Sequence, residues 1–203
     1  MARVAFLDTV HEVLWERLTA AGMDCMHAET MSRDDLLAGA LSTCNGIVLR
    51  SRLTVDAALI DALPELQWVA RSGAGLDNIN VAEAERRGVR VISSPEGNAT
   101  SVGEHTVGQL LAMLHRLTRA DRHVRCGGWD REGHRGLELE ARTVGIIGFG
   151  TFGQFLARRW QRHGHVIFAQ SRSDYAAVAE AMGVHYVRTA EELVTQRLDV
   201  LVL

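Results

Sequence analysis

The sequence predicts an α/β fold in which helices cover doubly wound, parallel β-sheets, and three observations support this prediction. Short apolar runs alternate along the chain with segments of helical periodicity. Of the 203 residues, 47% are hydrophobic and 23% are charged, a composition typical of a globular protein with a buried core. Only two prolines are present and no short repeat recurs, which excludes disordered and fibrous classes.

The first domain is expected to span residues 1–98. Five apolar runs predict its strands at residues 4–7, 25–28, 46–49, 67–70 and 89–92. Helices are expected between these strands. The first should begin at a capping box from Thr9 to Glu12 and the second at a cap on Ser32. The third is expected over residues 55–63, where Pro64 ends it, and the fourth over residues 81–87 before Gly88.

The second domain is expected to span residues 99–203 and to begin with one long helix. A second capping box, Ser101 to Glu104, predicts its start, and arginines near Arg125 suit its C-terminal end. A polar connector over residues 130–142 follows. The remaining predicted elements are strands at 143–147, 166–169 and 199–203 and helices over 152–163, from 173 or 174 to 182, and from Thr189.

Charge and cysteine content exclude several function classes. The net charge of −3 provides no basic field for nucleic acid or an anionic membrane. All 22 basic residues are arginines, which excludes a lysine nucleophile and a P-loop lysine. Cys25, Cys44 and Cys126 form no CxxC pair and no zinc-binding histidine pattern occurs, so we expect three buried free thiols and no metal site. With no signal peptide or membrane-spanning run, a cytoplasmic protein is expected.

Gly148, Gly150 and Gly153 form a GxGxxG pattern that follows an apolar strand and opens a helix. The first glycine permits a tight turn, the second lets a pyrophosphate approach the backbone, and the third allows the helix to pack closely on the strand. The first turn, with Thr151 and Phe152, presents N–H groups to the phosphates. The sequence therefore predicts a dinucleotide-binding loop; the alternative is a glycine-rich turn without a ligand.

The end of the next strand predicts which dinucleotide is bound. An NAD site usually has a carboxylate there for the ribose 2′-hydroxyl, but this chain has Ser171, Arg172 and Ser173. Arginine can bind a 2′-phosphate in bidentate fashion, so NADP is the preferred cofactor and NAD remains possible. In the alternative interpretation Arg172 is only solvated and Asp174 takes the acidic role, although Asp174 is also a candidate helix cap.

Between about residues 45 and 150 the chain resembles the D-isomer-specific 2-hydroxyacid dehydrogenases, especially phosphoglycerate dehydrogenase-like members. The matching stretches are VLRS at 48–51, RSGAGLDN at 71–78, SPEGN at 94–98, VGE at 102–104 and GLEL at 136–139, ahead of TVGIIG at 143–148. The resemblance implies a flavodoxin-like substrate domain, a helix at a dimer interface, and a Rossmann NAD(P)-binding domain. It also implies a soluble oxidoreductase that acts on a small 2-hydroxy acid or 2-oxo acid.

The resemblance assigns roles to particular residues. Arg50 and Ser51 would face the anionic groups of the substrate. The substrate carboxylate would be held by the backbone of Ser72, Gly73, Ala74 and Gly75. Ala74 would also lie near the nicotinamide, and Asn98 and Val102 would line the cleft on the substrate and cofactor sides.

By the same resemblance, the catalytic arginine, glutamate and histidine lie beyond Leu203, so no catalytic residue is assigned and the chain alone is expected to lack turnover. His105 is the local candidate for an acid–base group, and its alternative is an ordinary histidine on a helix face. His163 and His165 are expected at the surface.

A second resemblance is carried by GFGTFGQFLA at 148–157 and SRSDY at 171–175. By these motifs, residues 145–203 resemble plant-type arogenate and prephenate dehydrogenases, which are NADP-linked. Three functions therefore stay open: a 2-hydroxyacid dehydrogenase, an arogenate or prephenate dehydrogenase-like enzyme, and a dinucleotide-binding module without turnover. The second sheet is expected to be an incomplete Rossmann sheet of three strands, in which residues 143–147 have an unpaired edge. This edge and the apolar terminal strand over residues 199–203 are expected to drive association.

Overall fold

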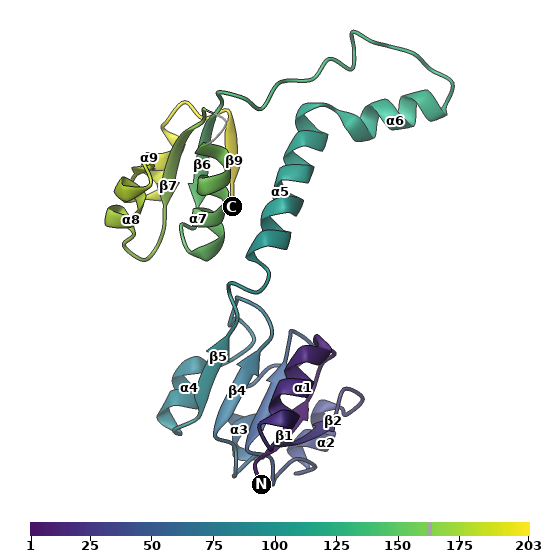
Figure 1. Ribbon diagram of the computed structural model, residues 1–203, viewed down its shortest axis with the longest axis vertical. Coiled ribbons are helices and arrows are strands. Elements are labelled where there is room, and N and C mark those ends of the chain that lie inside the picture. Colours follow the sequence, from purple (N-terminus) through teal and green to yellow (C-terminus); the bar gives the residue numbers. More distant parts are fainter. Residues whose placement is uncertain (162–163) are drawn as a thin grey trace. The chain divides into compact units, whose positions relative to one another are not determined.

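The computed structural model describes residues 1–161 and 164–203 and divides the chain into two compact units, Met1–Gly97 and Asn98–Leu203. Each unit is an α/β layered structure with an all-parallel sheet, which confirms the predicted fold class (Figure 1). The last two residues of the helix predicted over 152–163, Arg162 and His163, lie outside the described residues.

The first unit has five strands in the order β2-β1-β3-β4-β5. Its elements are β1 (Arg3–Phe6), α1 (Glu12–Ala20), β2 (Asp24–His27), α2 (Arg33–Leu37), β3 (Gly46–Leu49), α3 (Ala57–Asp61), β4 (Trp68–Arg71), α4 (Val81–Arg86) and β5 (Arg90–Ser93).

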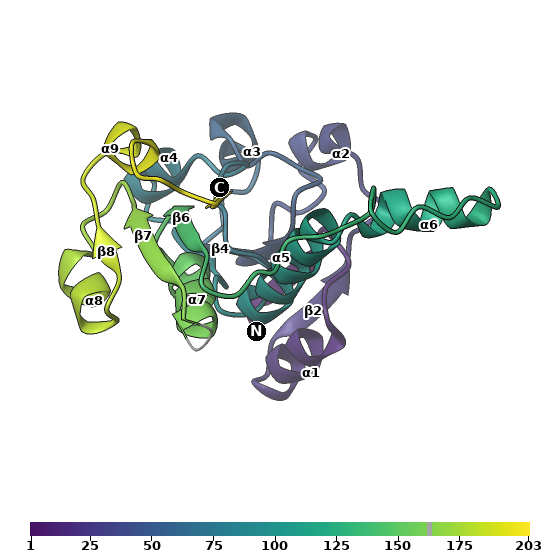
Figure 2. The same cartoon turned by 90° about the horizontal axis from the view of Figure 1, so that it is seen from above.

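Helices cover both faces of this first sheet (Figure 2). On one face, α1 packs its Leu14 and Leu18 near Val4, Phe6 and Val48 of the strands. The opposite face carries α2, α3 and α4, and the alternate strand residues there form the larger core, which includes Ala5, Leu7, Ile47, Leu49, Leu36, Leu59 and Ile60. The apolar runs at β1 and β3 are continuous because both faces of these inner strands are buried, whereas the edge strands β2 and β5 keep exposed residues.

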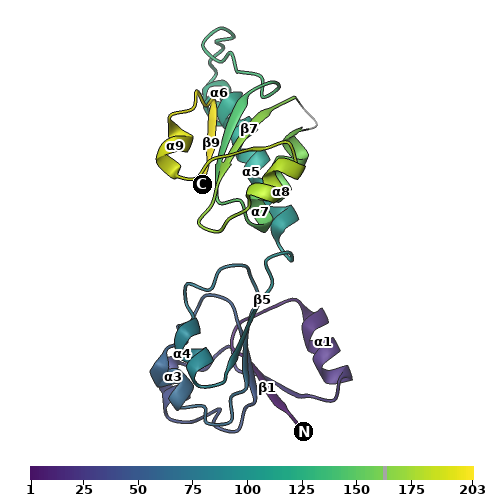
Figure 3. The same ribbon diagram turned by 90° about the vertical axis from the view of Figure 1, so that its left-hand side faces the viewer.

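The second unit has four strands in the order β8-β7-β6-β9. Its elements are α5 (Ala99–Leu114), α6 (Leu117–Arg125), β6 (Thr143–Ile147), α7 (Thr151–Trp160), β7 (Val166–Gln170), α8 (Ala176–Ala181), β8 (His185–Tyr186), α9 (Ala190–Val194) and β9 (Val200–Val202). Helices α5, α7 and α8 lie on one side of this sheet and α9 on the other (Figure 3).

The prediction of an unpaired edge at residues 143–147 was wrong. β6 pairs on one side with β7 and on the other with β9, where Val144 lies opposite Val200. The sequence pattern did not reveal β8, because two residues are too short to show strand periodicity. The terminal strand β9 thus covers the edge of β6 and is itself an edge strand of the sheet, with Leu201 43% exposed.

The prediction of one helix from residue 101 to residue 125 was also wrong. The chain breaks at Arg116, which takes the left-handed conformation at φ 54°. The connector returns to this break, where Leu137 N donates to Leu114 O at 3.0 Å and Arg116 Nη1 donates to Gly133 O at 2.9 Å. Helix α6 buries none of its residues, so no core contact keeps it in line with α5.

Two predicted capping boxes were misplaced. Helix α1 is capped by His11, whose Nδ1 accepts from Val13 N at 3.2 Å, and not by Thr9. Helix α5 begins after Asn98 without a side-chain cap, so Ser101 and Glu104 lie inside it. By contrast, Ser32 and Thr189 cap α2 and α9 as predicted, accepting from Asp35 N and Glu192 N at 3.2 and 3.1 Å.

Two expectations about exposure need correction. Cys126 is exposed and Cys25 is half-buried, and of the three cysteines only Cys44 is buried. Cys126 follows the solvated helix α6, whereas burial raises the pKa of the Cys44 thiol. His165 is buried at 8% exposure because it packs beside Trp160, and its Nδ1 lies 3.2 Å from Arg142 O.

Arginine side chains connect loops in both units by donating to backbone carbonyls. Arg52 Nη2 donates to Leu7 O at 2.6 Å, and Arg33 Nη1 donates to Thr54 O at 2.8 Å. Arg142 Nε donates to Glu138 O at 2.8 Å in the connector. A guanidinium has five donors in a fixed plane, which suits it to hold several loop carbonyls at once.

Candidate functional site

The loop after β6 has the conformation that its three glycines permit. Gly148 has φ +100°, which L side chains rarely adopt. A Cβ on Gly153 would lie 2.1 Å from Gly148 O, so only glycine lets α7 start this close to the strand. A Cβ on Gly150 would meet nothing nearer than Tyr175 Oη at 4.0 Å. The fold therefore requires the first and third glycines, and at Gly150 it leaves open space.

Helix α7 starts directly at this open space. Gly150 is its N-cap, and no side chain caps the helix, so the amides of Thr151, Phe152 and Gly153 form the free N-terminus. Phe149 anchors the loop, because its side chain is fully buried in the core and its carbonyl accepts a hydrogen bond from Gln154 Nε2 at 3.0 Å. These features fit a pyrophosphate, which binds to free N–H groups at the positive end of a helix dipole.

The turn after β7 carries Ser171, Arg172 and Ser173. Tyr186 of β8 fixes this turn, because its hydroxyl donates to Ser173 O at 2.8 Å and to Ser171 O at 3.3 Å. Arg172 is exposed, and its guanidinium makes no hydrogen bond or ion pair with another described residue. Asp174 Oδ1 accepts from Ala176 N at 2.9 Å at the start of α8. The N-cap of α8 is Tyr175, whereas the sequence predicted Ser173 or Asp174, and Asp174 instead holds the turn that precedes the helix. Among the described residues, Arg172 is open to a ligand.

Tyr186 is a residue that the sequence reasoning missed. It belongs to the two-residue strand that the pattern did not reveal, and its contacts are with residues 13 and 15 positions earlier. The only available signal was its place in the short run 184–187.

The motif VGE at residues 102–104 joins α5 to α7. A Cβ on Gly103 would lie 2.3 Å from the Phe155 ring, so the two helices approach as closely as glycine allows. Arg159 stacks over the same ring at 4.9 Å and pairs with Glu104 at 3.6 Å. Val102 is 39% exposed on α5. His105 is exposed there too, with its Nε2 2.8 Å from Gln109 Nε2, which agrees with an ordinary histidine on a helix face.

In the first unit, the substrate candidates follow the carboxyl ends of β3 and β4. Arg50 and Ser51 come directly after β3 and are both exposed. Ser72, Gly73, Ala74 and Gly75 come directly after β4. Neighbouring parallel strands bring these two turns to one edge of the sheet, as the pairing of Leu49 with Arg71 shows.

Arg71 ties these two turns together, although the sequence reasoning gave it no role. Its Nε donates to Arg50 O at 3.0 Å and its Nη1 donates to Gly75 O. Asn78 adds to this contact by donating its Nδ2 to Arg50 O at 3.1 Å and to Leu53 O at 2.8 Å. The backbone of both turns is therefore fixed, while the exposed Arg50 side chain has no hydrogen bond or ion pair with another residue that the structure describes.

Asn98 belongs to the other unit: it is the first residue of the unit Asn98–Leu203 and the N-cap of α5. The structure therefore groups the candidates in two sets, one in each unit. Within the residues that the structure describes, no cluster of three or more histidine, cysteine or acidic residues could hold a metal ion. No described helix combines the length and apolar character that crossing a lipid bilayer requires.

Comparisons with known proteins relate the chain to one family. The family model for the catalytic domain of D-isomer specific 2-hydroxyacid dehydrogenases matches residues 4–197. D-3-phosphoglycerate dehydrogenase of Rattus norvegicus is 31% identical over 94% of this chain and 36% of its own length. The protein of the same name from Mycobacterium tuberculosis is 38% identical over 75% of this chain and 29% of its own length. The chain thus spans about a third of these relatives.

Solved structures agree with this relation. The PH0520 protein of Pyrococcus horikoshii matches with a TM-score of 0.85 and 25% identity, over 100% of this chain and 62% of that one. The pyruvate reductase of Chlamydomonas reinhardtii matches with a TM-score of 0.66 and 28% identity, over 95% and 58%. The family match also includes most of the segment after the glycine loop, so the comparisons do not favour a junction of two dehydrogenase families there.

Proposed function

This chain belongs to the D-isomer specific 2-hydroxyacid dehydrogenase family, and from that premise we propose that it binds NAD(P) together with a small 2-hydroxy acid or 2-oxo acid. In this proposal residues 98–203 hold the dinucleotide and residues 1–97 hold the organic acid. A bound nicotinamide would supply the chemistry by accepting or donating a hydride at the carbon that carries the hydroxyl group.

The open space at Gly150 is the observation that supports dinucleotide binding most directly. The backbone at Gly150, with φ −73° and ψ −157°, is accessible to any residue, and no protein atom would crowd a Cβ. Glycine at this position is therefore explained by a ligand that needs the space and the helix N-terminus beside it.

The turn after β7 supports NADP as the preferred dinucleotide. Its open cation, Arg172, and the hydroxyls of Ser171 and Ser173 are donors suited to a 2′-phosphate. The carboxylate nearest in sequence, Asp174, already accepts a hydrogen bond from the amide of Ala176.

For the organic acid, the proposal assigns the binding of its anionic groups to Arg50 and Ser51. The carboxylate would lie against the backbone of residues 72–75, which Arg71 and Asn78 hold in place. The names of the relatives favour a phosphorylated hydroxy acid, for which the exposed guanidinium of Arg50 is a suitable partner.

The test of dinucleotide binding is Gly150→Asp. The new carboxylate would face the pyrophosphate, and like charges about 4 Å apart repel by several kcal/mol near a protein surface. We expect NADP affinity, measured by fluorescence titration of the reduced form, to fall at least about a hundredfold. The circular dichroism should stay unchanged, because the space for the side chain already exists.

Ala177→Asp is the matched control, since Ala177 is exposed on α8 and the substitution adds the same charge to the same unit. It should leave NADP affinity nearly unchanged. If folded Gly150→Asp protein kept its affinity, the loop after β6 would not be a phosphate site.

A further inference from the structure

The chain has two tyrosines, and both lie beside the loop after β6. Both are half-buried and approach Phe149 of this loop, with ring centroids 6.4 Å away for Tyr175 and 6.5 Å away for Tyr186. Their hydroxyls differ in what they contact. Tyr186 Oη lies 2.8 Å from Ser173 O, whereas Tyr175 Oη makes no hydrogen bond with another residue that the structure describes. Of the two hydroxyls, that of Tyr175 is therefore available to a ligand.

Tyr175 lies where the chain leaves the turn after β7 and enters α8. It is the N-cap residue of α8, and its carbonyl accepts from Ala179 N at 2.9 Å. Its ring meets the Phe149 ring edge to face, at an interplanar angle of 76°. Because the backbone and the ring are both held, the hydroxyl has a defined position. This position borders the open space at Gly150, where a Cβ would have Tyr175 Oη as its neighbour at 4.0 Å.

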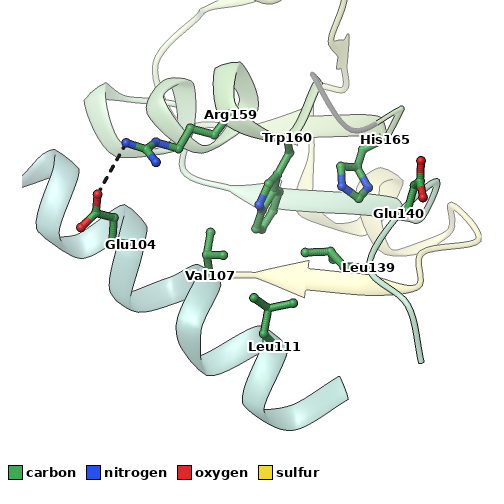
Figure 4. Close-up of a pocket in the computed structure, with 8 residues that line it drawn as sticks. All are labelled: Glu104, Val107, Leu111, Leu139, Glu140, Arg159, Trp160 and His165. Carbon is green, nitrogen blue, oxygen red and sulfur yellow. Dashed lines mark ion pairs between the residues drawn. The ribbon is translucent and has the colours of Figure 1, made fainter. Parts of the chain in front are cut away.

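The arginines of α7 lie at the other end of that helix. Arg158 and Arg159 belong to its last turn, and Arg159 is paired with Glu104 of α5 at 3.6 Å (Figure 4). Arg158 follows Gly150 by two turns of helix, about 12 Å along the axis. A phosphate at the start of α7 therefore meets main-chain N–H groups and neutral side chains. A neutral hydroxyl is a suitable additional donor for it.

We propose that Tyr175 is a further contact residue for the dinucleotide and donates its hydroxyl hydrogen to the pyrophosphate at Gly150. The inference rests on the proposed function, because it requires a dinucleotide at this loop. A charge-assisted O–H···O⁻ bond is about 2.5–2.7 Å long. The 4.0 Å between the hydroxyl and the place of the absent Cβ thus leaves room for a phosphate oxygen between them. The pyrophosphate is common to NAD and NADP, so Tyr175 strengthens the binding of both, whereas Arg172 acts on the 2′-phosphate of NADP alone.

Tyr175→Phe is the test, because it removes the hydroxyl and keeps the ring against Phe149. The affinities for NADPH and NADH, measured by fluorescence titration, should fall by the same factor. We expect roughly a five- to tenfold loss, the effect of a charge-assisted hydrogen bond at a half-buried site. The compound 2′-AMP carries the 2′-phosphate without a pyrophosphate, and its affinity, measured by calorimetry, should be the same for the variant and the unaltered chain.

Tyr186→Phe is the matched control for stability. It removes a hydroxyl that is bonded within the protein and should lower the Tm, whereas Tyr175→Phe should not, since that hydroxyl has no partner among the described residues. The two variants also assign the two tyrosine signals in a chain labelled with ζ-¹³C-tyrosine. ADP, which has a pyrophosphate but no 2′-phosphate and no nicotinamide, should shift the Tyr175 signal more than the Tyr186 signal.

Three results would overturn the inference while the unaltered chain binds both dinucleotides. They are an unchanged affinity for NADPH and NADH in folded Tyr175→Phe protein, a loss confined to NADPH, and an ADP titration that leaves the Tyr175 signal in place. In these cases the proposed function stands and only the role of Tyr175 is lost. If the unaltered chain binds neither dinucleotide, the proposed function and this inference fail together.

Discussion

Individual arginine side chains differ in whether the protein already uses their donors. The Arg71 side chain is 14% exposed and binds backbone carbonyls of two turns, so its role is to position the backbone. Arg172 is exposed and takes no partner among the residues that the structure describes. A ligand can therefore engage Arg172 without breaking a contact within the protein.

The contribution of Arg172 can be measured by its removal. A charge-assisted hydrogen bond is worth roughly 1.5–3 kcal/mol, and the exposure of this side chain places the effect at the lower end. Arg172→Ala should weaken NADP binding about tenfold and leave NAD binding nearly unchanged. Ser171→Asp should invert the preference, because a carboxylate repels the 2′-phosphate and accepts from a ribose hydroxyl.

Arg188→Ala is the control in these titrations, since it removes another exposed arginine of the same unit. It should not affect either dinucleotide. Equal losses of NADP and NAD in Arg172→Ala would contradict the assignment of this arginine to the 2′-phosphate.

At the scale of elements, the contact between β6 and α7 was predicted from the sequence because its determinants are local. The spacing of Gly148, Gly150 and Gly153 predicts that helix α7 packs closely on strand β6. The structure agrees, because a Cβ on Gly153 would lie only 2.1 Å from Gly148 O. The break at Arg116 was not predictable in this way. Its contacts come from Gly133 and Leu137 of the connector, and the sequence at the break has no glycine or proline.

The strand–helix contact predicts a large effect for a single methyl group. Gly153→Ala places a Cβ 2.1 Å from Gly148 O, a backbone atom that cannot move without shifting the loop. We expect a loss of about 1–3 kcal/mol in unfolding free energy, the usual cost of overpacking, measured by urea denaturation.

Gly108→Ala provides the comparison, because Gly108 lies in α5 and a Cβ there has no neighbour within 4 Å. This variant should be more stable by roughly 0.5–1 kcal/mol, since alanine loses less conformational freedom in a helix. A stable Gly153→Ala protein would mean that the loop adapts freely.

For the whole molecule, the order of apolar runs was sufficient to predict the fold class. Strands and helices alternate along the chain, and this alternation is typical of parallel α/β sheets. The candidate residues of the glycine loop were also identified from local spacing. The support that Arg71 and Asn78 give to Arg50 was not, because these contacts join residues 21 and 28 positions apart. Such contacts depend on the register of β3 and β4, which the sequence pattern does not predict.

The stability of the whole chain should fall in acid. Hydrogen bonds from Arg33 hold the pKa of Asp56 below its ordinary value of 3.8, and the amide of Thr143 does the same for Asp199. Because the folded state binds protons less readily than the unfolded state, this stabilisation is complete above pH 3.8 and is lost as the pH falls through the lowered values.

Asp56→Asn tests this sign. The variant should have a lower Tm than the parent at neutral pH, and the difference should shrink as the pH falls from about 5 to about 2. Asp34→Asn is the control, because Asp34 is exposed and its side chain has no hydrogen bond to another described residue. A difference that stays constant over this range would show that Asp56 acts only through packing.

The guanidinium contacts to loop carbonyls give the chain an unequal response to the two ends of the pH scale. A lysine ammonium loses its proton near pH 10.4, whereas an arginine guanidinium stays protonated up to about pH 12. Since all 22 basic residues are arginines, the donors of Arg33, Arg52 and Arg71 remain in place in alkali. Alkaline buffers would therefore leave these hydrogen bonds to loop carbonyls intact at pH values where equivalent bonds from lysine would already be lost.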